Sequence, residues 1–152
     1  MKIKKWLKWS AALLAVGFGG LQLTNPRHEN PPVLPGHDLM ASNPPPPAIA
    51  SMLKISCYDC HSYETKWPWY GYVAPVSWYL VRDVTAARAA MNFSDWPHDD
   101  QARVRKRWRH IADDLDSQDM PLPQYTRMHP EARLTDAQRA EFIKWATEQA
   151  GD

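Results

Sequence analysis

The stretch Ser56-Cys57-Tyr58-Asp59-Cys60-His61-Ser62 decides the fold, because it gathers two thiols and an imidazole within five residues. The chain has 152 residues and no other cysteine, so a disulfide framework is excluded and a zinc site would lack its second cysteine pair. On one helical turn, two thiols three positions apart can each bond a vinyl group on the same porphyrin edge, while the adjacent imidazole reaches the iron. The order Cys-x-x-Cys-His therefore predicts one haem c, attached through Cys57 and Cys60, with His61 as an iron ligand.

Apolar residues around this motif follow helical spacing in four segments, which begin near Ile49, Val76, Val104 and Thr135. The last segment has a capping box, Thr135 with Gln138, while Ser94 and Asp95 are the expected start signals of the third. The sequence has no strand pattern of useful length, so the βαβ context of a thioredoxin-like thiol pair is missing. Residues 48–152 are predicted to form a small, all-α, cytochrome c-like domain around one haem.

The N-terminal 47 residues divide into two predicted parts. In residues 1–23, four lysines precede an apolar stretch from Trp9 to Leu23, which is typical of an export signal. Because no A-x-A cleavage site follows, we favour retention as an N-terminal membrane helix, with the domain on the periplasmic face of the cytoplasmic membrane. Residues 24–47 contain eight of the 14 prolines and are expected to be a linker. This linker is either a free tether or a strap along the domain, held chiefly by Val33 and Leu34.

Met120 is the best candidate for the sixth iron ligand. It precedes Pro121 and Pro123, which stiffen a loop able to present the thioether, and it lies upstream of the last helix. The alternatives at this position are His110, Met128, His129 or no protein ligand. Ligation by His61 and Met120 favours one-electron transfer, whereas an open or labile sixth position favours a haem-based ligand sensor or a peroxidase-like enzyme.

Three long motifs resemble those of a known family. They are SCYDCHSYETKWPWYGYVAPVSWYLVRDV at residues 56–84, NFSDW at 92–96 and MPLPQYTRMHPEARLT at 120–135, with NPPV at 30–33 upstream. The chain closely resembles the bacterial haem-binding domain family, from whose pattern Tyr63 and Lys66 depart. The resemblance implies a periplasmic, membrane-attached monohaem protein.

The haem pocket is expected to combine aromatic walls with donors to the two propionates. The candidate wall residues are Trp67, Trp69, Tyr70, Tyr72 and Trp78. The candidate propionate partners are Arg82, Arg88, Trp69 and Tyr125. The backbone oxygen of Pro68 or Pro75 is a plausible acceptor for the second nitrogen of His61.

Charge and composition narrow the classes of partner. The formal net charge is +1, which disfavours nucleic-acid binding by this exported domain. A basic run at residues 103–109 precedes an acidic run at 113–119, forming either a solvated face or a docking patch for a charged redox partner protein. Because no acid–base constellation accompanies the motif, an electron carrier is favoured over a catalyst.

Overall fold

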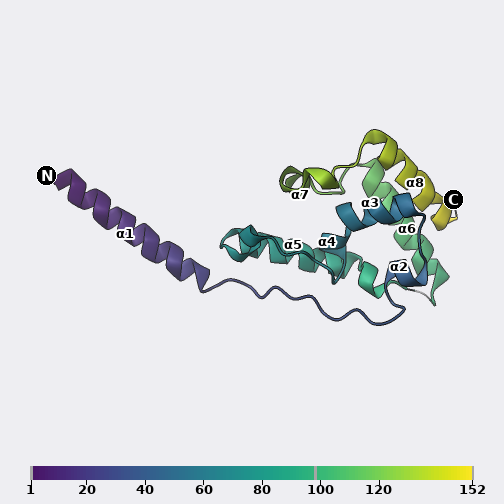
Figure 1. Ribbon diagram of the computed structural model, residues 1–152, viewed down its shortest axis with the longest axis horizontal. Coiled ribbons are helices and arrows are strands. Elements are labelled where there is room, and N and C mark those ends of the chain that lie inside the picture. Colours follow the sequence, from purple (N-terminus) through teal and green to yellow (C-terminus); the bar gives the residue numbers. More distant parts are fainter. Residues whose placement is uncertain (1, 98, 152) are drawn as a thin grey trace.

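A computed structural model describes residues 2–97 and 99–151, and within these ranges the protein contains helices and no β-strand. The prediction of an all-α fold is confirmed (Figure 1). The α-helices are α1 (Lys2–Gln22), α2 (Leu39–Ser42), α3 (Pro47–Ser56), α4 (Tyr58–His61), α5 (Val76–Ala90), α6 (Gln101–Asp116), α7 (Pro123–Met128) and α8 (Asp136–Ala150). Three short 3-10 helices lie between them: η1 (Trp69–Tyr72), η2 (Phe93–Asp95) and η3 (Pro130–Ala132).

The ends of α8 and α6 follow from local chemistry. In α8 the capping box predicted from Thr135 and Gln138 is present in full. The start predicted for α6 at Ser94 and Asp95 is wrong, because both residues belong to η2 and the side chain of Asp100 caps α6 instead. Proline restricts the residue before it to extended conformations, and Trp96, which precedes Pro97, has φ −79° and ψ 132°. A helix therefore cannot run from Asp95 directly into α6.

The core is built on aromatic rings that lead from α6 to the cysteine motif. Helix α6 packs against α8 and buries Trp108 completely, and the Trp108 ring lies 4.9 Å from that of Trp96. Phe93 stacks between Trp96, at 5.9 Å, and Tyr58, at 5.1 Å. Tyr58 is the second residue of the Cys-x-x-Cys-His motif, so core packing fixes the position of α4. Burial of each such ring contributes about 1.5–3 kcal/mol, which makes this stack a main source of stability.

Residues 25–34 lie along the domain as an extended strap, and a turn at residues 35–37 leads from it into α2. The side chain of Asn25 donates to Tyr72 O at 2.9 Å, and that of Asn30 donates to Thr65 O at 2.8 Å. The His28 ring bonds Gly71 O at 2.8 Å. A Cβ at Gly71 would meet a side-chain carbon of Leu80 at 2.6 Å, so a larger residue there would have to displace the Leu80 side chain. Polar side chains hold the strap, and of the two residues expected to pack, Val33 is half-buried and Leu34 is exposed.

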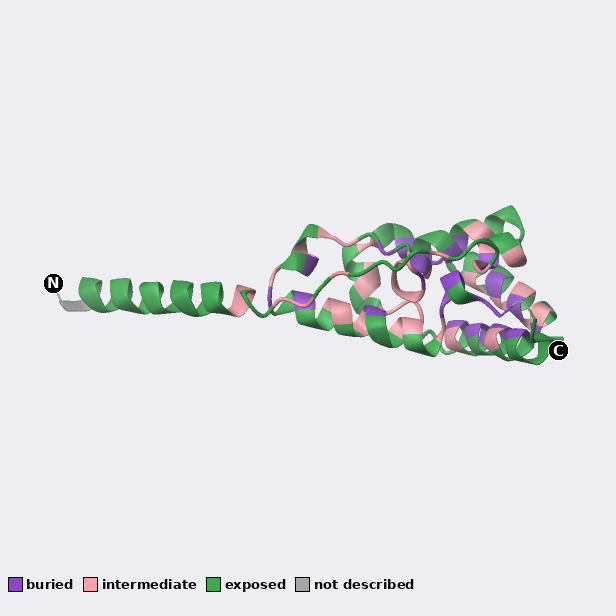
Figure 2. Ribbon diagram, turned by 90° about the horizontal axis from the view of Figure 1, so that it is seen from below, coloured by how far each residue is buried: buried purple, intermediate pink, exposed green. Residues whose placement is uncertain are grey.

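Helix α1 projects away from the domain, and nearly all of its described residues are exposed (Figure 2). Its last residue nevertheless touches the domain: Gln22 Oε1 accepts from Ala74 N at 2.9 Å, and Gln22 Nε2 donates to Ala74 O at 3.3 Å. Within residues 2–97 and 99–151, no helix combines the length and the apolarity that a membrane crossing requires. The membrane helix expected from the sequence stays a prediction.

Candidate functional site

A cavity of about 780 Å³ lies next to the cysteine motif and is enclosed by five helices and one loop. Its volume lies within the range of about 300–1,000 Å³ that is usual for sites of small molecules and cofactors. Cys60 and His61 of α4 line it, together with residues of α3, α5, α6 and α7 and of the loop 120–122. The motif is therefore placed against a space large enough for a cofactor.

The imidazole of His61 is held in a form that can bind a metal. Its Nδ1 lies 3.1 Å from the backbone oxygen of Met91, and a carbonyl oxygen can only accept, so Nδ1 carries the hydrogen. Burial lowers the pKa of His61, which keeps the ring neutral and leaves the lone pair on Nε2. The acceptor predicted at Pro68 or Pro75 is wrong: the chain turns out of α5 at Met91 and presents this oxygen instead.

The two cysteines are free thiols on one turn of backbone. Both Cys60 N and His61 N donate to Cys57 O, at 3.2 and 2.9 Å. Burial raises the pKa of Cys57 to about 12 and that of Cys60 to about 11, so both are protonated at neutral pH. Thiol exchange and zinc binding both require thiolates. In the described part of the chain, moreover, no group of three or more His, Cys, Asp or Glu is arranged to hold a metal ion.

Met120 lines the same cavity as His61 but comes from the loop that follows α6. Its backbone is fixed on both sides, since Met120 N donates to Asp114 O at 3.2 Å and Arg139 donates to Met120 O at 3.1 Å. Of the alternative ligands, His110 also lines the cavity, whereas Met128 and His129 do not. Of the candidates for the sixth iron ligand, Met120 and His110 are therefore the two that line the cavity. Met91 also lines it, and its backbone oxygen lies beside His61.

The chain matches a known protein family. A family model described as a haem-binding domain matches residues 16–148. The chain belongs to this haem-binding domain family. No curated protein and no solved structure gives a significant match to the chain. The match covers most of the chain and identifies haem as the ligand of the domain.

The wall of the haem-binding domain's cavity differs from the expected aromatic one. Helix α5 contributes four small side chains, Ala86, Ala87, Ala89 and Ala90, and Leu122 adds a larger apolar one. Small side chains leave room beside the helix for a flat, bulky group. The predicted wall residues Trp67, Trp69, Tyr70, Tyr72 and Trp78 do not line the cavity. They lie on and around η1, where Trp69 is exposed and the Trp78 indole donates to Thr24 O.

The cationic side chains at the cavity are also not those predicted. Arg103, Lys106 and Arg107 share one face of α6 and line the cavity, so they are placed to pair with two anionic propionates. Arg82 instead bonds the neighbouring Asp83 at 2.8 Å, on an exposed part of α5. Arg88 binds the strap. Lys106 and Arg107 follow Arg103 by three and four residues, on a helix whose apolar face was predicted from the sequence. This spacing is the signal that could have identified the three residues as one cationic face.

Tyr125 closes the site on the α7 side. It lines the cavity, and its hydroxyl donates to Asp59 Oδ2 at 2.8 Å, within the Cys-x-x-Cys-His motif. Its ring stacks on that of His129 at 4.5 Å, and His129 Nε2 lies 2.9 Å from the hydroxyl of Tyr70. Burial and the bond to Asp59 raise the pKa of Tyr125 well above its usual value. The predicted propionate donor is thus engaged by the motif itself, and it joins α7 to α4.

Proposed function

We propose that this haem-binding domain is a membrane-tethered monohaem c-type cytochrome, which carries single electrons outside the cytoplasm. The observation that carries the proposal is that Cys60, His61 and Met120 line one cavity. Bound haem supplies an iron that changes oxidation state by one electron. Ligation of that iron by histidine and methionine favours electron transfer over ligand chemistry.

The residues around the cavity have separate tasks in this proposal. Cys57 and Cys60 hold the porphyrin covalently, and Met91 O orients His61 through Nδ1 so that Nε2 faces a metal. Met120 supplies a thioether from a backbone fixed by two hydrogen bonds. The α5 alanines and Leu122 exclude water from the ring, and the α6 cations neutralise the propionates. The electron's protein partner is recognised separately, and the charged face of α6 is a candidate for that contact.

The tether and the location rest on the N-terminal segment. Lysines occupy the start of α1, and the apolar side chains that follow are exposed along the helix. This asymmetry of charge supports an N-terminal anchor with its lysines in the cytoplasm and the domain on the periplasmic face.

The test is a spectrum of the full chain matured with a haem-attachment system. Alkaline pyridine spectra of the denatured protein should show haem with both vinyl groups saturated, and the mass should exceed that of the bare polypeptide by one haem. A polypeptide at its bare mass would refute covalent attachment.

The sixth ligand is tested by a matched pair of variants, Met120→Ala and His110→Ala. His110 lines the same cavity but its ring pairs with Asp114 at 3.7 Å and is largely exposed. Met120→Ala should open the iron to carbon monoxide in the reduced protein, while His110→Ala should leave the spectrum unchanged. Rapid binding of carbon monoxide to the unmutated protein would instead favour the second candidate, a ligand sensor or peroxidase-like enzyme, for which the cavity residues His110 and Arg107 would supply polar groups.

A further inference from the structure

One end of the domain carries a group of exposed aromatic and apolar side chains. This aromatic surface consists of Trp69, Tyr72, Val76, Trp78 and Tyr79, from η1 and the first turn of α5. The exposed fractions are 79% for Trp69, 58% for Tyr79 and 53% for Tyr72. No charged residue occurs in the sequence from residue 67 to residue 81. Exposed apolar patches of this kind usually mark a site of interaction with another surface.

The aromatic surface is joined directly to the end of α1. Gln22 makes two hydrogen bonds to the backbone of Ala74, and Asn25 donates to Tyr72 O at 2.9 Å. The indole of Trp78 donates to Thr24 O at 3.2 Å. These bonds connect the aromatic surface to the chain within three residues of the last turn of α1. Figure 1 shows the same arrangement, with α1 ending beside the start of α5.

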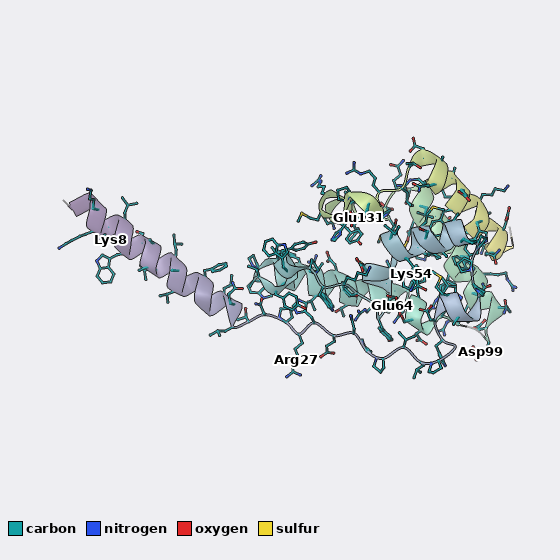
Figure 3. All side chains as sticks on the ribbon, in the orientation of Figure 1. Lys8, Arg27, Lys54, Glu64, Asp99 and Glu131 are labelled. Atoms are coloured by element: carbon teal, nitrogen blue, oxygen red, sulfur yellow. The ribbon has the colours of Figure 1, made fainter. Side chains whose placement is uncertain are left out.

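Helix α1 continues the uncharged surface. Its sequence contains no charged residue from Trp9 onwards, and the next charged residue after the helix is Arg27. Its apolar side chains, including Leu13, Val16 and Phe18, are exposed, and Lys8 lies on the part of α1 remote from the domain (Figure 3). The uncharged part of α1, which begins at Trp9, thus ends next to a cluster of tryptophan and tyrosine side chains.

Tryptophan and tyrosine are enriched at the boundary between lipid and water, because their rings are apolar while their N–H and O–H groups bind water and headgroups. We propose that the aromatic surface lies in the headgroup region of the bilayer and docks the haem domain against the membrane. This inference rests on the proposed tether by α1. It gives the domain a fixed orientation, with η1 and the start of α5 facing lipid and the opposite end, at α2 and the C-terminus, facing away (Figure 1).

The test uses the full-length holoprotein in bilayer nanodiscs of equal parts phosphatidylethanolamine and phosphatidylglycerol. The probe is a trace of phosphatidylcholine that carries a diazirine near the start of one acyl chain. After illumination, lipid adducts are located by mass spectrometry of tryptic peptides. The peptide 67–82 covers the aromatic surface, and the peptide 145–152 is the internal control, because it carries the half-buried Trp145 on α8, at the opposite end of the domain (Figure 1).

Adducts are expected on α1 and on peptide 67–82 but not on peptide 145–152. The double variant Trp69→Ser, Tyr79→Ser should lower the yield on 67–82 by about threefold or more and leave α1 labelling unchanged. Leu34→Ser replaces a side chain that is 58% exposed outside the aromatic surface, and it should change neither yield. An unaltered haem spectrum shows that each variant is folded. Adducts on α1 alone would overturn the docking surface while leaving the tether intact. Adducts on neither segment would overturn the tether, whereas haem attachment is judged independently by the spectrum.

Discussion

Replacing Arg88 by methionine should release the strap without disturbing the haem site. The Arg88 guanidinium donates four hydrogen bonds: to Ser62 O at 2.7 Å, and to Glu29 O, Asn30 Oδ1 and Thr65 Oγ1 at 2.8 Å each. Two of these acceptors belong to the strap and two to the segment after the cysteine motif. Methionine retains a long apolar side chain but donates no hydrogen bond, so the variant removes these four bonds and leaves only the bond from Asn30 to Thr65 O between the two segments.

The magnitude follows from the burial of the four hydrogen bonds. Those to Ser62 and Thr65 are part-buried, and a hydrogen bond to a charged group contributes about 1.5 kcal/mol at the lower end of its range. The two bonds to the strap are exposed and together contribute little, about 0.5 kcal/mol. The total is a loss of about 3.5 kcal/mol in the free energy of unfolding.

Urea unfolding of the holoprotein measures the loss in the free energy of unfolding. The rate of tryptic cleavage measures how often the strap becomes accessible. Arg27 lies on the strap, and a loss of about 3.5 kcal/mol raises the unfolded population, and thus the rate of cleavage at Arg27 through that population, by about three hundredfold. Arg82→Met is the matched control on α5, because Arg82 bonds only the adjacent Asp83, and it should cost less than about 0.5 kcal/mol. Equal effects of the two variants on unfolding and cleavage would refute this role for Arg88. A changed haem spectrum in Arg88→Met alone would indicate that Arg88 pairs with a haem propionate, as the sequence predicted.

Further variants test the core, the cap and the α7 contact. Thr135→Ala removes the capping box of α8 and should lower the unfolding free energy by about 1 kcal/mol, measured in urea; no change would contradict the cap. Phe142→Ala empties a fully buried site and should cost about 3–5 kcal/mol in the same assay, and a loss below about 1 kcal/mol would show that the site collapses. Tyr125→Phe removes the donor to Asp59 and should cost about 1–2 kcal/mol, whereas Tyr79→Phe, on an exposed ring, should be neutral; equal effects would argue against the contact.

The parts of the molecule that the sequence predicted well are those that depend on neighbouring residues. The helical segments appear where apolar spacing indicated them, and Thr135 caps α8 as expected, because a capping box is complete within four residues. The resemblance to the haem-binding domain family is confirmed by the family match. The helices and the cap were predicted from short stretches read in isolation, and the resemblance from motifs that lie along the sequence.

The features that differ from the sequence expectations depend on contacts between distant segments. Arg82 and Arg88 follow the motif closely in the sequence, yet α5 points one at Asp83 and the other at the strap. The acceptor of His61 proved to be Met91, thirty residues away, because it depends on where α5 ends. The wall of the cavity is likewise set by which face of α5 lines it, and alanine gives no chemical signal of such a role. Periodicity locates a helix but does not say which face meets a cavity.

The strap is made before the residues that hold it in the folded domain. Asn30 leaves the ribosome before its partners, since Thr65 follows 35 residues later and Arg88 follows 58 residues later. The Met91 oxygen that orients His61 emerges later still. Until then the His61 ring lacks the backbone acceptor that fixes its tautomer in the folded domain. The end of α5 therefore completes the surroundings of His61 only after the whole cysteine motif has been made.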